Sequence, residues 1–88
     1  MAGYKKEVTL NFTFISEPEK PMVSLCVSKE MPFQETLILA AKKHGKDPSV
    51  LRPIYPAGTH ITGGTVEKVI EHGTRIYIID PSVSGSYQ

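Results

Sequence analysis

Apolar and polar residues alternate near the beginning of the chain, and this pattern limits the possible folds more than any other feature of the sequence. An apolar side chain at every second residue is typical of a strand with one buried face. We therefore predict a strand over residues 7–16, with a buried face made of Val8, Leu10, Phe12 and Phe14. Two prolines and three charged residues follow at 17–21, which favours a turn. The alternation resumes over residues 22–27, so the two strands are predicted to form an antiparallel hairpin.

A helical pattern follows the hairpin. Pro32 suits the first position of a helix, because its ring already holds φ near the helical value. Five side chains then recur at helical spacing on one face: Phe33, Leu37, Ala40, Ala41 and His44. Gly45 can adopt the left-handed conformation that ends many helices. The sequence therefore predicts a helix over residues 32–44.

Short elements are predicted in the region after this helix. Prolines at 48 and 53 flank an apolar piece at residues 51–55, which can form only a short or edge strand because proline lacks a backbone N–H. Thr65 is suited to cap a short helix that continues to Ile70, and Gly73 is suited to close it.

The last predicted element is a strand over residues 74–80. Ile76 and Ile78 lie on one face of it, and Tyr77 and Ile79 lie on the other. We assign the first pair to the core. The second pair is either a protein-binding face, since exposed apolar side chains on a sheet can mark one, or is covered by loop residues.

The order of the predicted elements is hairpin, helix, short strand, short helix and final strand, which is the order of the β-grasp fold. The helical crossover requires the final strand to run parallel to the first, in the middle of the sheet. We therefore predict an α+β, ubiquitin-like fold in which a mixed sheet packs on one main helix. The chain of 88 residues suits a single domain. We assign residues 1–80 to this domain, with its first few residues disordered, and residues 81–88 to a flexible C-terminal tail.

Charge and cysteine content narrow the class of protein. Ten basic and nine acidic side chains are mixed along the chain, whereas phosphate binding normally leaves a basic stripe, so no nucleic-acid partner is expected. Cys26 is the only cysteine, which excludes an internal disulfide and favours a reducing compartment. The sequence has neither a secretory signal nor an apolar run as long as a membrane span. We expect a monomer in the cytoplasm and nucleus, without direct membrane contact.

Catalytic and metal chemistry are not expected. The three histidines, at positions 44, 60 and 72, have no cysteine or carboxylate at the spacing of a zinc site. We therefore predict no metal, no cofactor and no enzymatic activity.

A segment of small residues, 81–88, follows directly on the last predicted strand and cannot pack into a core. Within it, Gly85 is followed by Ser86, Tyr87 and Gln88. Removal of these three residues would expose a glycine carboxylate on a flexible arm, which is the reactive end of ubiquitin-like modifiers. The alternative is a frayed terminus without a function.

Short matches to one family of modifiers recur in order over about residues 8–85. They are Glu17-Pro18, Pro21, Leu25-Cys26-Val27, Pro32-Phe33, Leu37, Ala40-Ala41, Gly58, Ile61, His72-Gly73 and Ile78-Ile79. No single match is specific, but in combination they resemble the family of ubiquitin-fold modifier 1, the small modifier of the UFMylation pathway.

The resemblance implies a function carried by the tail. A processing cysteine protease would cut between Gly85 and Ser86, with recognition of the tail at Val83 and Ser84. An ATP-dependent activating enzyme would then adenylate the Gly85 carboxylate and carry it as a thioester, and a conjugating enzyme and a ligase would join it to lysines of target proteins. Glycine suits these steps because it lacks a Cβ and leaves the carbonyl open to attack.

Two positions depart from the family pattern. The family has valine before the glycine, where this chain has Ser84, and a chain-building lysine before the His-Gly pair, where this chain has Glu71. Lys68, one helical turn earlier, is the possible substitute for chain linkage.

The family also receives a partner peptide in a groove between its main helix and the neighbouring strand, by addition of a strand to the sheet edge. The matching residues here are Cys26, Val27, Phe33 and Leu37.

Two other functions stand beside the modifier. The first is a non-covalent β-grasp interaction domain with an inert tail, which the fold alone does not distinguish from a modifier. The second is a sulfur carrier, which activates a terminal Gly-Gly pair, and the chain does not end with that pair.

Overall fold

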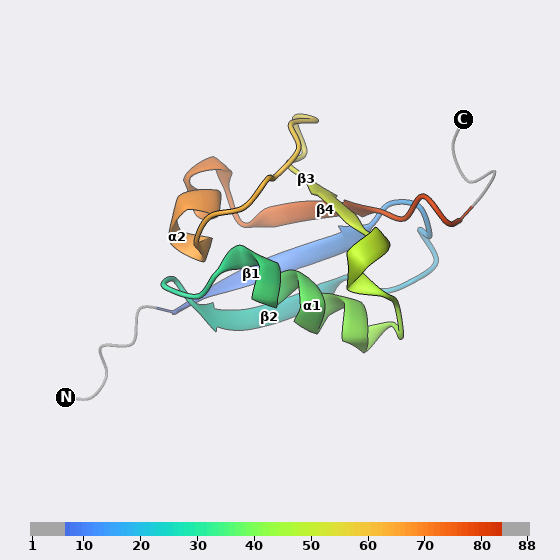
Figure 1. Cartoon of the computed structure of the whole chain (residues 1–88), viewed down its shortest axis with the longest axis horizontal. Helices are drawn as coiled ribbons and strands as arrows, with labels where there is room; N and C mark the ends of the chain where they lie inside the picture. The colour runs from blue at the N-terminus through green and yellow to red at the C-terminus, as the bar shows by residue number, and fades with distance from the viewer. Residues whose placement is uncertain (1–6, 84–88) are drawn as a thin grey trace.

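The computed structural model describes residues 7–83 and contains one mixed four-stranded sheet with a main helix packed on it (Figure 1). The strands lie in the order β2-β1-β4-β3. This arrangement confirms the predicted α+β, β-grasp architecture.

The N-terminal hairpin consists of β1 (Glu7–Phe14) and β2 (Val23–Ser28), which pair antiparallel. Strand β1 ends two residues earlier than predicted. The reason is a turn that begins at its last residue, because the Glu17 N–H donates to the carbonyl of Phe14. The apolar face of the hairpin points toward the helix, as the alternation requires.

Helix α1 (Phe33–Lys43) begins one residue after Pro32, whose backbone is extended, and ends one residue before His44. Gly45 has a φ of +66°, a left-handed conformation that residues other than glycine rarely adopt. This allows the chain to turn back, so that the Lys46 N–H donates to the carbonyl of Ala41 over 2.9 Å. The predicted glycine stop is therefore confirmed.

A short 3₁₀ helix, η1 (Pro48–Val50), follows α1 and was not predicted. The Asp47 carboxylate caps it by accepting a hydrogen bond from the Ser49 N–H at 3.0 Å. Strand β3 (Arg52–Ile54) comes next and pairs antiparallel with β4 at the edge of the sheet, where a strand containing proline is tolerated.

The C-terminal half continues with helix α2 (Val66–Val69) and a 3₁₀ turn, η2 (Ile70–His72), which ends at Gly73 with a φ of +108°. Strand β4 (Arg75–Ile79) then runs between β1 and β3, parallel to β1. The predicted parallel pairing of the first and last strands is confirmed.

The core lies between the sheet and α1, and α2 closes one end of it. Phe12 of β1 and Phe33 of α1 stack with their ring centroids 6.2 Å apart. The side chains that are at most 2% exposed include Leu10, Phe12, Phe14, Phe33, Leu37, Val66, Val69, Ile76 and Ile78. Residues from both halves of the chain therefore share a single core.

Thr65 caps α2, and its loss is expected to destabilise the protein modestly. The Thr65 hydroxyl accepts a hydrogen bond from the Lys68 N–H, at the long distance of 3.4 Å. We expect Thr65→Ala to lower the free energy of unfolding by about 0.5–1 kcal/mol, the low end of the range for caps. Urea denaturation followed by circular dichroism measures the change. Thr62→Ala, the same change in the exposed loop before α2, is the control, and equal effects of the two variants would show that the cap contributes nothing.

Candidate functional site

The residues that carry the predicted chemistry lie mostly outside the described part of the chain. Gly85 and Ser86 at the processing site, and Ser84 in the tail, follow the last described residue. Val83 is the one predicted tail-recognition residue that the structure describes, and it is half-buried. The described residues closest to Gly85 in the sequence lie in the segment 80–83, directly after β4.

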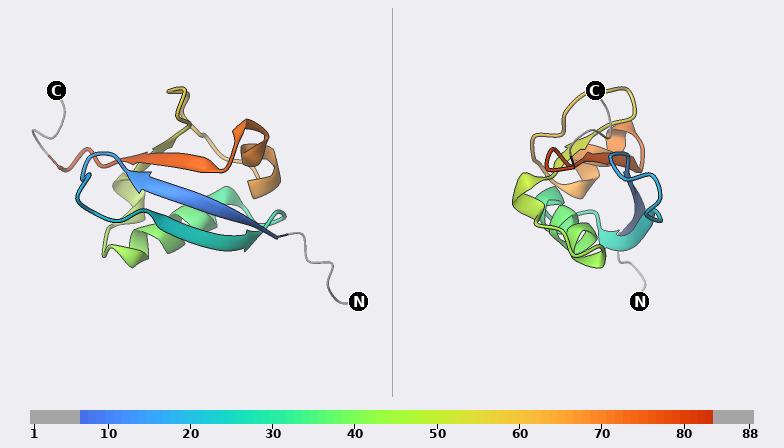
Figure 2. Two further views of the ribbon diagram at one scale, coloured as in Figure 1. Left: turned by 180° about the vertical axis from the view of Figure 1, so that it is seen from behind. Right: turned by 90° about the vertical axis from the view of Figure 1, so that its right-hand side faces the viewer.

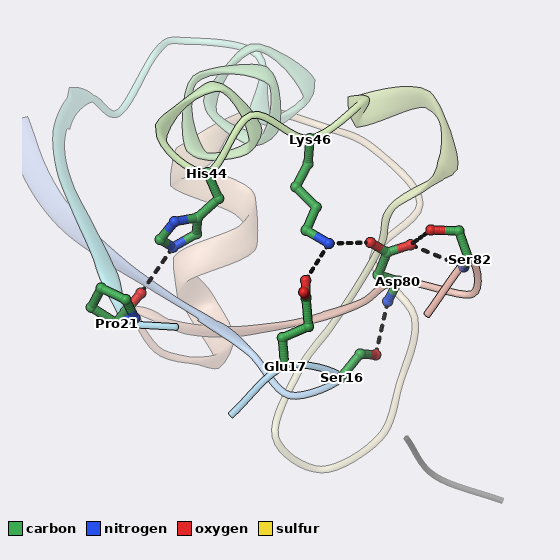
Figure 3. A network of polar contacts seen from close by, with 7 residues as sticks. All are labelled: Ser16, Glu17, Pro21, His44, Lys46, Asp80 and Ser82. Carbon is green, nitrogen blue, oxygen red and sulfur yellow. Dashed lines mark hydrogen bonds and ion pairs between the residues drawn. The ribbon is translucent and has the colours of Figure 1, made fainter. Parts of the chain in front are cut away.

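A cluster of polar side chains holds the segment directly after β4, where the predicted tail begins (Figure 3). Lys46, in the loop after α1, donates a hydrogen bond from Nζ to Oδ2 of Asp80 over 2.7 Å. The same ammonium forms an ion pair with Glu17, in the turn between β1 and β2. The Asp80 side chain is only 2% exposed and that of Lys46 15%. We call Ser16, Glu17, Lys46, Asp80 and Ser82 the tail-root cluster.

Hydrogen bonds also hold the backbone at Asp80. The Asp80 N–H donates to the hydroxyl of Ser16 at 3.0 Å, which extends the contact between the ends of β4 and β1. The Asp80 carboxylate accepts two hydrogen bonds from Ser82, one from the N–H at 3.0 Å and one from the hydroxyl at 2.6 Å. The Val83 N–H donates to the Asp80 carbonyl at 3.0 Å. Residues 80–83 therefore form a closed turn directly after β4.

Electrostatic interactions within the cluster favour the charged forms of Asp80 and Lys46. Burial by itself would raise the pKa of Asp80, but the hydrogen bonds from Lys46 and Ser82, with the attraction of the Lys46 charge, outweigh it and hold the pKa below its ordinary value. The pKa of Lys46 is raised, chiefly by its hydrogen bonds to Asp80 and then to Glu17. A lysine held in this way is not a free amine on the surface.

The sequence reasoning missed the tail-root cluster. The sequence pattern places Glu17 in a turn and gives no sign that Lys46 differs from the other lysines. One local signal was available, since an Asp-Pro-Ser run at 80–82 is typical of a turn closed by the aspartate side chain. The contact with Lys46, 34 residues away, has no such signal.

The four residues of the predicted partner groove do not form one surface. Val27, Phe33 and Leu37 are 4% exposed or less and belong to the core. Cys26 is exposed on the opposite face of β2, where its thiol donates to Glu7 at 3.5 Å, and this hydrogen bond is the main cause of the raised pKa of the thiol. The side chains are separated because successive residues of a strand point to opposite faces. Binding of a partner along the β2 edge stays a prediction.

A hollow does exist between β2 and α1, but it involves other residues. It has a volume of about 280 Å³ and lies between the beginning of β2 and the C-terminal end of α1, lined in part by Met22, Lys43 and His44. The Nε2 atom of His44 lies 3.0 Å from the carbonyl oxygen of Pro21, and the His44 ring makes a T-shaped contact with the ring of Phe14.

Lys68, the predicted chain-linkage lysine, lies on α2 and is exposed. Within residues 7–83 it forms no ion pair, so its ammonium is accessible to solvent. Its accessibility contrasts with that of Lys46.

The described part of the chain offers no group of three side chains that could bind a metal ion. Over the same residues, no helix is both long and apolar enough to span a membrane.

Comparisons with known proteins extend the description of the fold. No protein-family model and no curated protein matches the chain. Among solved structures, the chain is similar to the C-terminal ubiquitin-like domain of mouse tubulin-specific chaperone e, with a TM-score of 0.67 and 10% sequence identity. The similarity covers 89% of this chain and 90% of that chain. At this identity the similarity shows the fold alone, which is the ubiquitin-like β-grasp fold.

Proposed function

We propose that the chain is a ubiquitin-like protein modifier of the UFMylation type. One observation supports this most directly. The tail-root cluster fastens the chain at Asp80, directly after β4, and Gly85 is the sixth residue after the end of that strand. The residues that resemble the family of ubiquitin-fold modifier 1 supply the rest of the support.

The proposed chemistry takes place at the Gly85 carbonyl and uses no catalytic group of this chain. A cysteine protease hydrolyses the Gly85–Ser86 peptide bond, which leaves a glycine carboxylate. The activating enzyme converts this carboxylate and ATP into an acyl adenylate and pyrophosphate. An enzyme thiolate then displaces AMP to form a thioester, and a target lysine amine displaces the thiol to form an isopeptide bond.

Gly85→Ala is expected to abolish covalent conjugates, because a Cβ at the acyl position obstructs the narrow sites that glycine can enter. The chain is expressed with an N-terminal tag in cells of its source, and conjugates are identified by mass spectrometry. Arg75 is the last basic residue before Gly85, so trypsin should leave residues 76–85 as a branch on each modified lysine.

Ser86→Ala is the matched control for this experiment. Ser86 leaves with the cleaved extension, so the processed product and its conjugates should equal those of the original chain. An intact chain that continues past Gly85, with no branched peptide in any sample, would refute the modifier function.

A non-covalent interaction domain is the second candidate function. The similarity to a ubiquitin-like domain that forms part of a chaperone favours it, because there the same fold occurs inside a larger protein. Such a domain would keep residues 86–88 and form no covalent conjugates with either glycine or alanine at position 85, which the same experiment tests.

A further inference from the structure

A pocket with a volume of about 330 Å³ lies between the loop after β3 and the turn η2. Figure 2 shows this loop rising above β4, clear of α1, and returning toward α2. Such a volume is at the lower end of the range for ligand sites, so it suits one long side chain better than a whole helix or strand. We call it the corner pocket, and its lining residues are Tyr55, Pro56, Ala57, Thr59 and His72.

Backbone hydrogen bonds hold both walls of the corner pocket. In the loop, the Gly58 N–H donates to the carbonyl of Tyr55 over 2.7 Å, and the Tyr55 N–H donates to the carbonyl of Thr59 over 2.9 Å. The wall formed by η2 ends at Gly73, whose N–H donates to the carbonyl of Ile70 over 2.9 Å. Both walls are therefore in place before a ligand arrives, which lowers the entropy cost of binding.

Two aromatic rings form the inner side of the corner pocket. The Tyr55 ring packs against the edge of the core, and its centroid lies 4.7 Å from that of the His72 ring, with the two planes inclined by 48°. Tyr55 is half-buried, whereas the other lining residues are exposed. Tyr55 directly follows Ile54, which pairs with Tyr77, and successive residues of an extended chain point to opposite faces. The corner pocket therefore lies on the other side of the sheet edge from that pair.

A carboxylate stands at the rim of the corner pocket. Glu71 directly precedes His72 in η2, is exposed, and forms no ion pair with any residue in the range 7–83. Lys68, three residues earlier, does not pair with it. Burial raises the pKa of Tyr55, and the negative charge of Glu71 raises it further, so this charge acts on the phenol. The corner pocket thus combines two aromatic rings with a negative charge that has no partner among these residues.

This combination favours a planar cation as the ligand. Cations are attracted to the face of an aromatic ring, and arginine occurs there more often than lysine. A guanidinium is planar, so it can stack on a ring while its N–H groups donate to a carboxylate, whereas the lysine ammonium is a compact point charge. The methylene groups of an arginine side chain also suit the apolar surface of Pro56 and Ala57.

We propose that the corner pocket binds an arginine side chain of a partner protein. The guanidinium stacks on the Tyr55 ring and donates hydrogen bonds to the Glu71 carboxylate, and the methylene groups cover Pro56 and Ala57. The site uses no residue of the tail, so the proposal holds whether or not Gly85 is ever conjugated.

Amide NMR shifts of the full chain, titrated with an N-acetylated Ala-Arg-Ala amide at constant ionic strength, test this proposal. Saturable shifts are expected at Tyr55, Ala57, Thr59 and His72. The same peptide with citrulline in place of arginine has nearly the same shape but no charge, so it should bind about fivefold more weakly. A peptide with lysine at this position should also bind more weakly than the arginine peptide, because an ammonium does not stack.

Glu71→Gln should weaken binding of the arginine peptide about two- to fivefold, as expected for the loss of an exposed ion pair, and leave the citrulline peptide unaffected. Glu67→Gln is the matched control, because it removes the same charge at an exposed position of α2. It should leave the binding of both peptides unchanged. Tyr55→Leu keeps an apolar side chain but removes the ring, and should weaken the arginine peptide by a similar factor. Since Glu71 is exposed, Glu71→Gln tests the site even if Tyr55→Leu destabilises the fold.

Three results would overturn the proposal: shifts that do not saturate or that map to the β2 edge or α1, equal binding of the arginine and citrulline peptides, or equal behaviour of Glu71→Gln and Glu67→Gln. A Gly85→Ala chain should bind the arginine peptide normally, which separates this result from the fate of the modifier function.

Discussion

Asp80→Asn is expected to lower the free energy of unfolding at pH 7 by about 2–4 kcal/mol. Removing one partner of a buried ion pair usually costs about 3–5 kcal/mol, because the other charge stays buried without compensation. The expected loss is smaller here because Lys46 keeps its ion pair with Glu17. The asparagine also retains an oxygen that can accept hydrogen bonds from Ser82, so the effect comes from the lost charge.

The effect of this substitution should depend on pH in a defined direction. The folded-state pKa of Asp80 lies below its unfolded value, so its stabilisation is present above about pH 4 and is lost as the pH falls through the folded pKa. Lys46 has a raised pKa, so its contribution is complete below about pH 10 and is lost as the pH rises through the folded value. The difference between the original chain and the variant should therefore be largest between these limits and shrink in acid.

Urea denaturation at a series of pH values measures this difference. Glu19→Gln is the control, since Glu19 is exposed and forms no ion pair within residues 7–83. A variant at position 80 that unfolds at the same urea concentration as this control, at neutral and acid pH alike, would show that the tail-root cluster does not stabilise the fold.

Phe12→Ala is expected to have the largest effect on stability, a loss of about 3–5 kcal/mol. Phe12 is fully buried on the central strand β1 and stacks on Phe33, so its removal loses apolar burial, leaves a cavity and breaks an aromatic pair. A chain of this length has a total stability of about 4–13 kcal/mol. The variant should therefore be partly unfolded at 37 °C if the stability lies at the low end of this range.

Thermal unfolding followed by circular dichroism measures the loss. Leu39→Ala is the control, because Leu39 is 41% exposed on α1 and alanine favours the helix, so the expected change is within about 0.5 kcal/mol. If the two variants had the same melting temperature, Phe12 would not be part of the stabilising core.

Local patterns predicted most of the fold correctly. The alternation around Phe12, the helical stripe around Leu37 and the glycine stop at Gly45 each depend on residues within one element, and each is present in the structure. The parallel pairing of β4 with β1 also followed, because a helical crossover allows few other topologies. The 3₁₀ helix after Asp47 was missed, although an aspartate followed by proline was a usable signal.

The predicted groove failed as a single surface for a physical reason that the sequence already contained. Adjacent residues of a strand face opposite ways, so Cys26 and Val27 cannot line the same groove. The alternation along β2 assigns Val27 to the buried face and Cys26 to the exposed face.

The strands and helices, their order and the faces they bury can be predicted from the sequence, because hydrophobic period, capping and turn preferences act between residues a few positions apart. Which charged side chains meet depends instead on tertiary packing. Lys46, Glu17 and Asp80 come from three separate segments, and their contact depends on how α1 and the hairpin pack around the end of β4. The pairing of Arg52 with Ile79, and of Ile54 with Tyr77, likewise exists only once β3 and β4 meet in register. Long-range electrostatic contacts have no local period, so they follow from packing and cannot be read along the chain.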